Sequence, residues 1–458
     1  MPPVSFVLLN RPHGGNVVQP EFRDSNMSSR SFVFSLLLST ALLGHPALAG
    51  VVGQNVPSQP LNVERTAGLP LKSRAAWADY IARSQAQMQA DKASLAAERT
   101  NLAAIPAPPA EGNGDKSMPL KNPPEWYAGP EARHVADVIV SFQTPAGGWG
   151  KNTPRDGAVR LPGQSYVSDN LSRLPSPGDL DTPADVHWNY VGTIDNGATT
   201  TELRFLAKVA AAAPGNEGDA WRTSFLRGVD YLLAAQFPNG GWPQVWPLQG
   251  GYHDDITFND DALSDVASLL ADVAGGRNEF AFVPAVARAN AMQAEAHAVD
   301  CILKTQVHIG GKLTVWGQQH DALTLAPGSA RNFEPPALSS SESAGLLVYL
   351  MKIKNPSPDI AASVHTGVAW LQANALHDVA FTKVDGNRQL VATPGAPLLW
   401  ARYYSLTTGK PVFGDRDKTV HDDVQDLTAE RRNGYSWYNT TPQKALDAYA
   451  KWSQAHPK

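Results

Sequence analysis

One segment of the chain, GYHDDITFNDD at positions 251–261, places four carboxylates in a glycine-flanked loop before an expected helix. They belong to Asp254, Asp255, Asp260 and Asp261. An aspartate just before a helix usually caps it. Four in one short loop also supply the oxygen ligands that Ca²⁺ prefers. The spacing fits no EF-hand, so the segment predicts a hard-cation site, with helix capping as the alternative for each single aspartate.

A second polar loop, TIDNGATTTE at 193–202, also precedes an expected helix. Asp195 and Asn196 would supply two oxygen ligands to a shared calcium ion if this loop met the one that carries Asp260. The same residues are compatible with an ordinary helix N-terminus, in which the threonines cap the helix and Glu202 lies nearby. The sequence leaves both interpretations open.

Three loops rich in proline, glycine or aromatic residues each carry an arginine: 325–336 with Arg331, 400–404 with Arg402, and 411–417 with Arg416. A guanidinium group pairs with a carboxylate through two parallel hydrogen bonds, so these loops favour recognition of an acidic ligand. Arg416 stands between Asp415 and Asp417, and a simple ion pair with either is the alternative. Acidic loops, arginines and many Trp and Tyr residues together suit an acidic polysaccharide, because aromatic rings stack on sugars and cations neutralise uronate carboxylates.

The composition excludes several classes of function. The formal net charge is −5 and charged residues make up 18% of the chain. A slightly acidic chain without a Lys/Arg block is a poor candidate for nucleic-acid binding. The lone cysteine, Cys301, can form neither an internal disulfide nor a cysteine metal site. Hydrophobic residues at 43% fit a globular protein with at least one large core.

The N-terminus has the features of a targeting segment. An apolar run at 31–43, SFVFSLLLSTALL, follows Arg30 and precedes the tripeptide 47–49, which reads ALA. A positive charge, a short apolar run and a small-residue cleavage site form a secretory signal peptide; a buried helix is the alternative. The run is shorter than the ~20 residues of a membrane span. We expect a secreted or periplasmic protein that has no membrane contact after signal removal, with Met27 a more natural start than Met1.

Helix-forming patterns fill most of the remaining chain. A stretch at 73–104 is rich in good helix formers and ends at a proline-rich loop. Apolar residues at i, i+3 and i+4 predict further helices over 132–142, 201–213, 220–236, 261–273, 284–306, 339–353 and 360–372. Short β pairs are expected around 312–316 and 380–391. The irregular region 151–190 is long enough to predict a functional or mobile loop.

Three of the helix ends carry a weak repeat: SFQTPAGGWGKN (141–152), AAQFPNGGWPQVWP (234–247) and KTQVHIGGKLTVWG (304–317). Each has a glutamine at the helix end, then a Gly-Gly turn and a tryptophan. Such a repeat predicts helix pairs that stack on copies of themselves, and a ring is a natural solution. Simple C-caps with tryptophans that fill core gaps are a compatible alternative.

These patterns divide the chain into three parts. Residues 1–49 are expected to be an upstream extension and signal peptide, and 50–125 a linker with an N-terminal helical segment. The third part, 126–458, is expected to be the catalytic domain.

Four long motifs stand in one order along the third part: TIDNGATTTELRFLAKV (193–209), FPNGGWPQVWPLQGGYHDDITFNDDAL (237–263), LTVWGQQHDALTLAPGSARNFEPPALSSSESA (313–344) and PVFGDRDKTVHDDV (411–424). They closely resemble the pectate lyases of polysaccharide lyase family 10. The resemblance covers about 126–441. It implies a mainly α fold, an incomplete α/α toroid of about three helix pairs with a central substrate groove and small β additions.

The resemblance also implies a reaction. Calcium-dependent anti β-elimination would cleave α-1,4-linked polygalacturonate and leave 4,5-unsaturated oligogalacturonides. The C5 hydrogen lies α to the carboxylate, so its removal builds negative charge that calcium and arginines stabilise. We expect pectate as the partner, no nucleic acid, and a monomer.

Site residues carry over motif by motif. The resemblance implies Arg416 as the base, and Arg331 and Arg402 as binders of substrate carboxylates. Because arginine normally has a pKa above 12, nearby cations would have to lower it, and activity should rise above pH 8.

For Ca²⁺, the resemblance implies Asp195 and Asp260 as ligands, with Asn196 as a further oxygen ligand. Asp261 is the alternative to Asp260.

Two other functions remain open. A glycoside hydrolase would use two carboxylates such as Asp195 and Asp255 and need no metal. A non-catalytic pectin-binding module would bind without turnover.

Overall fold

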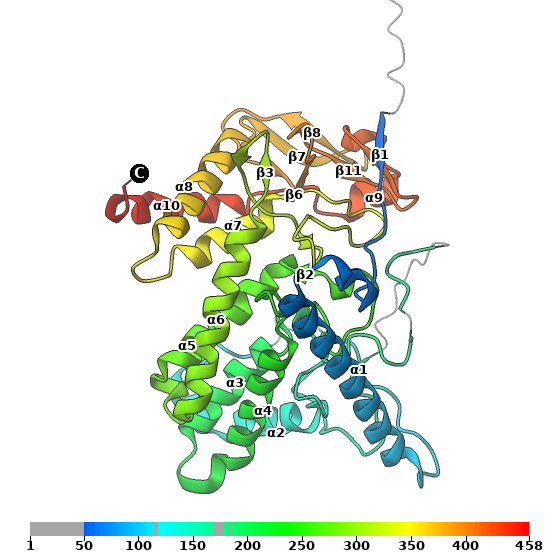
Figure 1. The fold of residues 1–458 in the computed structure, drawn as a ribbon, viewed down its shortest axis with the longest axis vertical. Coiled ribbons are helices and arrows are strands. Elements are labelled where there is room, and N and C mark those ends of the chain that lie inside the picture. Colours follow the sequence, from blue (N-terminus) through cyan, green and yellow to red (C-terminus); the bar gives the residue numbers. More distant parts are fainter. Residues whose placement is uncertain (1–49, 113–117, 169–177, 184, 458) are drawn as a thin grey trace, which may run out of the picture. The chain divides into compact units, whose positions relative to one another are not determined.

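A computed structural model describes the chain except for residues 1–49, 113–117, 169–177, 184 and 458 (Figure 1). The expected upstream extension and signal peptide therefore lie outside the described residues. The described residues belong to one compact unit that runs from Leu48 to Lys458. None of the helices in this described part is long and apolar enough to cross a membrane.

The protein is mainly helical. Its α-helices are α1 (Leu71–Arg99), α2 (Pro130–Ser141), α3 (Thr200–Ala212), α4 (Asp219–Ala235), α5 (Ala262–Gly275), α6 (Ala285–Thr305), α7 (Ser340–Leu350), α8 (Pro358–Ala373), α9 (Ala429–Gly434) and α10 (Pro442–Ala455). The helix predicted from composition corresponds to α1, those predicted from periodicity correspond to α2–α8, and all are confirmed. The described parts of 151–190 contain neither a helix nor a strand, as expected for an irregular loop.

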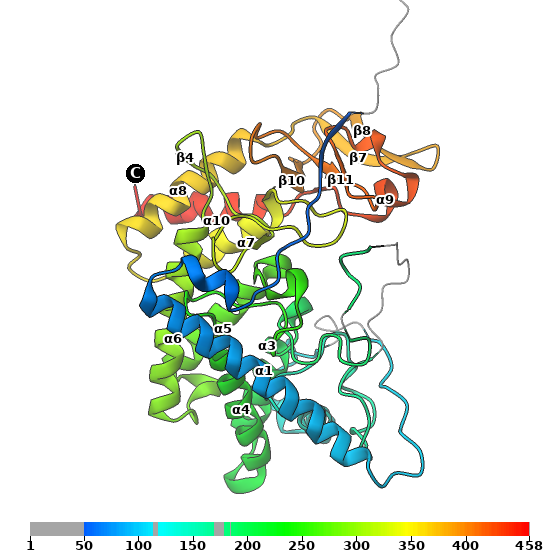
Figure 2. The ribbon, with the colours of Figure 1, turned by 45° about the vertical axis from the view of Figure 1, so that its right-hand side comes forward.

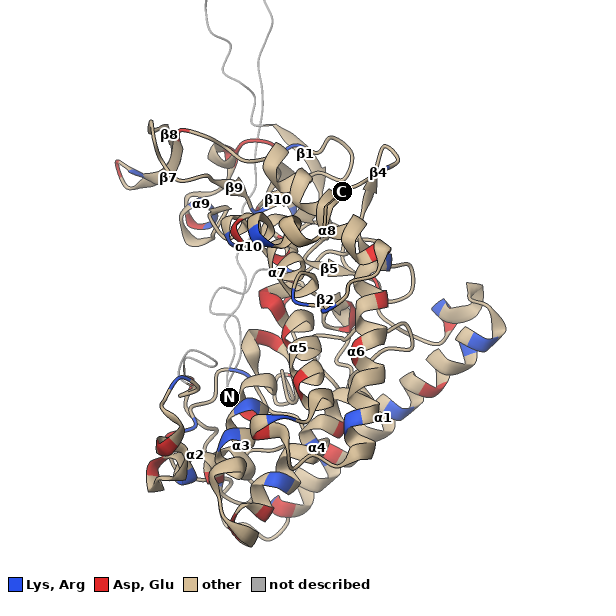
Figure 3. Ribbon diagram, turned by 90° about the vertical axis from the view of Figure 1, so that its left-hand side faces the viewer, with Lys and Arg blue, Asp and Glu red and all other residues tan. Residues whose placement is uncertain are grey.

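Two rows of helices make up the body. In the first row α2 contacts α4, α4 contacts α6, and α6 contacts α8; in the second, α3 contacts α5, α5 contacts α7, and α7 contacts α10. The rows also pack on each other, for example α5 against α6, which run side by side in Figures 1 and 3. The amphipathic pattern explains this packing. In α3 the side chains of Leu203, Leu206 and Val209 are fully buried at the spacing of one helix face.

Glutamines that follow α2, α4 and α6 join each of these helices to the next first-row helix through hydrogen bonds. Each side-chain amide donates to a carbonyl of its own turn and to one of the following first-row helix: Gln143 to Gly147 and Ser224, Gln236 to Gly240 and Ala294, and Gln306 to Thr314 and Ser363. The repeat seen in the sequence therefore corresponds to a structural repeat of the helix pairs.

The tryptophans of the repeat have a matching role. Each buried indole donates from Nε1 to a carbonyl near the end of the preceding first-row helix: Trp149 to Ile139, Trp242 to Leu232, Trp316 to Ile302 and Trp400 to Leu371. All four residues are fully buried. The fourth tryptophan extends the series to α8. These bonds fix the start of the loop that follows each tryptophan.

The strands are short and pair mainly loops. They are β1 (Val51–Gln54), β2 (Ile256–Thr257), β3 (His308–Ile309), β4 (Lys312–Leu313), β5 (Gln319–His320), β6 (Leu338–Ser339), β7 (Val379–Val384), β8 (Asn387–Ala392), β9 (Trp400–Ala401), β10 (Tyr403–Tyr404), β11 (Phe413–Gly414), β12 (Thr419–His421) and β13 (Tyr438–Asn439). Antiparallel pairs join β2 to β5, β3 to β4, β6 to β10, β7 to β8 and β9 to β13. The only three-stranded sheet among the described residues has the order β1-β12-β11.

The N-terminal part packs on this body. The Tyr80 hydroxyl of α1 donates to the Ala235 carbonyl at the end of α4, and Trp77 and Tyr80 contact the Phe237 ring. Figure 2 shows α1 beside the α4 region, and Figure 3 shows acidic and basic residues interspersed along it. Residues 50–70 differ from the expected linker, because they form β1 and a 3-10 turn that contact distant loops. Such contacts have no local sequence signal.

Candidate active site

The two acidic loops meet in front of α3 and α5. Asp195 opens the 3-10 turn Asp195–Gly197, and Asp260 lies in the 3-10 turn Asn259–Asp261. The middle residues of these turns, Asn196 and Asp260, have positive φ angles of 51° and 50°. The Asn259 amide joins the turns, since it lies 2.8 Å from Asp260 Oδ2 and 3.4 Å from Asp195 Oδ1.

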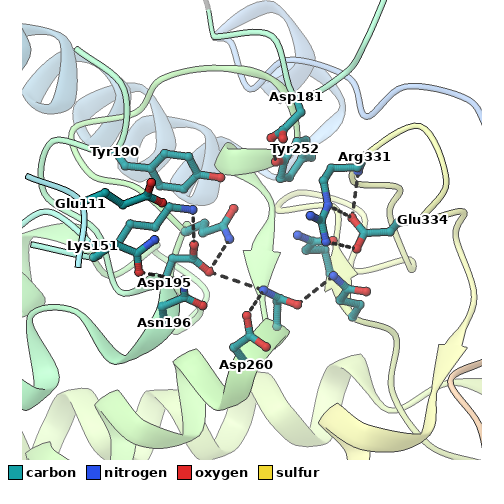
Figure 4. Close-up of a pocket in the computed structure, with 15 residues that line it drawn as sticks. Glu111, Lys151, Asp181, Tyr190, Asp195, Asn196, Tyr252, Asp260, Arg331 and Glu334 are labelled. Atoms are coloured by element: carbon teal, nitrogen blue, oxygen red, sulfur yellow. Dashed lines mark hydrogen bonds and ion pairs between the residues drawn. The ribbon is translucent and has the colours of Figure 1, made fainter. Parts of the chain in front are cut away.

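Helix capping does not explain these residues. The N-cap residues of α3 and α5, Thr199 and Asp261, make no side-chain capping hydrogen bond. The Thr199 hydroxyl instead binds the Thr193 carbonyl and the Trp149 amide. The left-handed turns direct Asn196 and Asp260 into a shared pocket (Figure 4). Asp261 instead lines a separate cavity between α5, α7 and α10.

Both acidic and basic side chains line the pocket. Its lining residues are Glu111, Lys151, Asn152, Asp181, Tyr190, Asp195, Asn196, Gln244, Tyr252, Asn259, Asp260, Gln318, Gln319, Arg331 and Glu334 (Figure 4). These residues come from loops that are far apart in the sequence. Of the six site residues predicted from the sequence, four line this pocket: Asp195, Asn196, Asp260 and Arg331.

Asp195 is a compensated carboxylate. Lys151 Nζ lies 2.6 Å from its Oδ2 and 3.3 Å from the centre of the Tyr190 ring, and Gln244 donates to its Oδ1 at 2.9 Å. Burial raises the pKa of Asp195, but the charge of Lys151 outweighs it and holds the pKa below the ordinary value. Burial lowers the pKa of Lys151, but the charge of Asp195 raises this pKa by more, so the lysine stays charged.

Asp260 lacks such compensation. Burial, followed by the charges of Asp195 and Glu342, raises its pKa to about 6, and Arg402 only partly opposes this. A buried carboxylate next to other carboxylates is stabilised by a bound cation. This part of the pocket therefore has the electrostatics of a cation site.

The donor set fits calcium. In the described part of the chain no three His, Cys, Asp or Glu side chains come together as a metal site, so a cation here needs amide oxygens or a ligand carboxylate besides Asp195 and Asp260. Gln244 Oε1 is buried without a hydrogen-bond partner, and Asn196 lies beside it in the pocket lining. Hard oxygen donors of this kind are those that Ca²⁺ takes.

Arg331 faces the pocket from the opposite wall. Its Nε and Nη2 donate to Glu334 at 2.9 and 2.6 Å, and the Tyr435 hydroxyl donates to the same carboxylate at 2.6 Å. Burial raises the pKa of Glu334, but Arg331 and Tyr435 outweigh burial and hold it at about 2. Burial lowers the pKa of Arg331, and the charge of Glu334 reverses this and raises it well above the ordinary value.

Arg402 lies next to the pocket. Its Nη2 donates to Glu342 of α7 at 2.8 Å, and its Nε lies 3.2 Å from the Tyr403 hydroxyl. Its positive charge partly opposes the rise in the pKa of Asp260. Arg402 therefore contributes positive charge to the site from behind its lining.

Arg416 and Arg331 both lie against the Phe333 ring. The guanidinium carbons of Arg416 and Arg331 lie 5.5 and 4.8 Å from the centre of the Phe333 ring. Arg416 pairs with Glu430 at 2.8 Å, rather than with either neighbouring aspartate. It does not line the pocket. The structure thus brings Arg331 to the carboxylates and leaves Arg416 next to it.

A third arginine, Arg431 of α9, was not predicted and belongs to the same cluster. Its guanidinium carbon lies 4.2 Å from the centre of the Phe333 ring. Burial lowers its pKa, Glu430 opposes this, and Arg416 and Arg331 lower it further.

Sequence reasoning also missed polar residues that the repeat places in the pocket. Lys151, Gln244 and Gln318 each stand two residues after a repeat tryptophan and line the pocket, and Arg402 stands two residues after Trp400. Because each tryptophan is anchored to a helix end, this position recurs in space. The repeat therefore carried a signal for these pocket residues. It lay two positions after each tryptophan, outside the Gln, Gly and Trp positions that defined the repeat.

The carboxylate pair named for a hydrolase, Asp195 and Asp255, does not meet in this pocket. Asp255 does not line the pocket with Asp195; it lies 2.6 Å from the Ser58 hydroxyl. Burial raises the pKa of Asp255 to about 8.

Comparisons with known proteins agree with this site. A family model described as pectic acid lyase matches residues 143–446. Two similar solved structures are a family 10 polysaccharide lyase from Cellvibrio cellulosa and an aspartate-to-alanine variant in complex with trigalacturonic acid. Both have 30% sequence identity and a TM-score of 0.60; the match covers 74% of this chain and 97–98% of theirs. No curated protein matches the chain at a significant level.

The matched residues include Asp195, Asp260 and all the arginines of the site. The family model spans well over half of the chain, and nearly the whole length of both solved lyases is matched. The chain belongs to the pectic acid lyase family and is a polysaccharide lyase of the pectate lyase class.

Proposed function

We propose that this enzyme cleaves α-1,4-linked polygalacturonate by calcium-dependent anti β-elimination and releases 4,5-unsaturated oligogalacturonides. The observation that carries the proposal is one pocket in which Arg331 and Lys151 face Asp195 and Asp260. The trigalacturonic acid complex of the similar Cellvibrio lyase supports galacturonate as the substrate class.

The pocket suits the charge that develops in this reaction. Removal of the C5 proton builds negative charge on the adjacent uronate carboxylate, and fixed positive groups then stabilise the transition state more than the ground state. Lys151 and Arg331 stand on opposite walls of the pocket, so a uronate between them meets a cation on each side (Figure 4). Arg402 adds charge from behind.

Calcium would be held by Asp195 and Asp260 together with amide oxygens such as those of Asn196 and Gln244. When bound, it would neutralise the substrate carboxylate, stabilise the developing charge and lower the pKa of nearby arginines. Because no third acidic side chain gathers with Asp195 and Asp260 as a metal site in the described part of the chain, we expect substrate and metal to bind together.

For the proton acceptor, the geometry favours Arg331 over Arg416. Arg331 lines the pocket with the carboxylates, and its Nη1 is not used in the pair with Glu334. Glu334 raises the pKa of Arg331, so the base is generated only when cations bind nearby, and activity rises towards alkaline pH. Arg416, predicted from the sequence as the base, would bind a substrate carboxylate on the next sugar.

The two helix rows fit an incomplete α/α toroid, which we propose as the architecture, with the loops after the first row forming its substrate groove. The predicted signal peptide supports secretion or export to the periplasm as the site of action. We propose that the mature chain works as a monomer, since every pocket residue comes from one chain.

The test is incubation of the mature chain with polygalacturonate, read by ultraviolet absorbance of the unsaturated product. We expect absorbance to rise with added Ca²⁺ and to stay flat with EDTA. Reducing ends that accumulate in EDTA without absorbance would overturn the proposal in favour of hydrolysis.

A further inference from the structure

The N-terminal segment 50–58 lies outside the family match, yet it contacts two of the arginine loops of the active site. In Figures 1 and 2 the blue chain runs from β1, beside β11, down to α1. The sequence distance is large: Asn55 and Arg331 are 276 residues apart.

Asn55 is the centre of these contacts. Its side-chain amide lies 2.9 Å from the Arg331 carbonyl, 2.9 Å from the Asn332 carbonyl and 3.2 Å from the Glu334 carbonyl. Only 3% of the residue is exposed. One buried amide therefore gathers the backbone of the turn whose two ends carry the Arg331–Glu334 ion pair.

The same segment is joined to the loop of Arg416. Strands β11 and β12 form a hairpin with Arg416 in its turn, and β1 adds to the outer edge of β12. The backbone N–H of Asn55 also donates to the Lys418 carbonyl at 2.7 Å. The segment thus bridges the arginine of the pocket wall and the arginine beside it.

Ser58 anchors the next part of the segment. Its hydroxyl lies 2.8 Å from the Ser329 carbonyl, two residues before Arg331, and the Ser329 hydroxyl donates to the Val56 carbonyl at 2.6 Å. The 329–334 loop is therefore fixed on both sides of Arg331 by one stretch of chain.

From these contacts we infer that Asn55 is a positioning residue of the reaction: it holds the 331–334 turn so that the Arg331 guanidinium faces the pocket. This inference rests on the proposed function of Arg331. Backbone N–H groups also donate to the Arg331 and Glu334 carbonyls. Loss of the Asn55 amide would therefore remove a second bond from these two carbonyls and the side-chain donor of the Asn332 carbonyl, and the turn would shift to recover them. A displacement of about 1 Å of a catalytic group costs on the order of 10²-fold in rate.

The experiment compares Asn55→Ala with Asn62→Ala in the full mature chain. Asn62 lies shortly after this segment, and its side chain accepts a local bond from the Arg65 backbone N–H. With polygalacturonate and saturating Ca²⁺, we expect kcat of Asn55→Ala to fall about 10- to 100-fold while KM changes less than about 2-fold. Asn62→Ala should match the unsubstituted enzyme. An unchanged kcat of Asn55→Ala would overturn the inference while leaving lyase activity in place.

A double-substitution cycle separates positioning from general stability. In an Arg331→Lys background, Asn55→Ala should cause no further loss of kcat, because the residue acts through Arg331. Losses that multiply would contradict the inference. If Asn55→Ala does not fold, Asn55→Ser, which keeps one donor, gives the same comparison: a lower kcat at constant KM supports the inference, and an unchanged kcat refutes it. Failure of the proposed function is distinct, because the unsubstituted enzyme would then form no unsaturated product.

Discussion

Two carboxylates of the pocket differ in how well nearby positive charge balances their own charge. Asp195 has Lys151 at 2.6 Å, whereas the pKa of Asp260 rises to about 6 through burial and its acidic neighbours. This asymmetry gives the two aspartates different roles. In the proposed mechanism, Asp195 would hold Lys151 in place for the substrate, and Asp260 would supply most of the unbalanced negative charge that attracts calcium.

Lys151→Met should lower kcat/KM by about 10²-fold or more, because it removes a buried charge that faces the substrate carboxylate and leaves Asp195 unpaired. Methionine keeps the length of the side chain but loses the ammonium group, whose Nζ lies 3.3 Å from the centre of the Tyr190 ring. Steady-state kinetics on polygalacturonate measure the effect, with the exposed Lys410→Met as the matched control. Equal kcat/KM for both variants would remove Lys151 from the account.

Arg331→Lys and Arg416→Lys distinguish the two candidates for the base. We expect Arg331→Lys to lower kcat by about 10²–10⁴-fold, the usual contribution of a general base. Arg416→Lys should mainly raise KM, because it weakens bidentate pairing with a substrate carboxylate. The reverse pattern would restore Arg416, the base implied by the sequence resemblance, and place Arg331 among the binding residues.

At the scale of elements, the repeated helix ends position the site. Each tryptophan ties a loop to a first-row helix, and the residue two positions later, such as Lys151 or Gln244, then reaches the pocket. The glutamines tie successive first-row helices together. The scaffold and the site thus depend on the same short segments.

Gln306→Leu should lower the free energy of unfolding by about 2–4 kcal/mol, because the Thr314 carbonyl and the Ser363 hydroxyl lose their buried partner in the core. The midpoint of urea unfolding measures the loss. Gln454→Leu is the control, since Gln454 makes one exposed bond to the Ala450 carbonyl and should cost less than about 0.5 kcal/mol. Similar losses for both would show that the helix-end bonds carry little stability.

Asp255→Asn tests the contact between the N-terminal segment and the acidic loop. Burial raises the pKa of Asp255 to about 8, above its unfolded value, so this group's contribution to stability is lost as pH rises from about 4 to about 8. An asparagine keeps a donor for Ser58 and cannot ionise. We expect the variant to be more stable than the unsubstituted enzyme at pH 9, by roughly 2–4 kcal/mol, and nearly equal at pH 4. Thermal melts at both pH values check this, and parallel pH profiles would contradict it.

For the molecule as a whole, the sequence was informative where the signal is local. Helix-forming composition predicted α1, and periodicity predicted α2–α8, because one buried face recurs every 3.6 residues. The acidic loops and Arg331 were found because their residue types are unusual for plain turns. Residues 50–58 were interpreted as a linker, because their partners, such as Arg331, lie hundreds of residues away. Lys151 was missed because it stands two residues after a repeat tryptophan, outside the Gln, Gly and Trp positions that defined the repeat.

The most direct test of the whole account is the mass of the products formed in H₂¹⁸O. Elimination breaks the C4–O bond without adding water, so the account predicts one unsaturated fragment per cleavage, about 18 Da lighter than its saturated counterpart, with no ¹⁸O fixed by the cleavage itself. Saturated fragments, with one ¹⁸O atom fixed per cleavage at the new reducing end, would show hydrolysis and contradict the account.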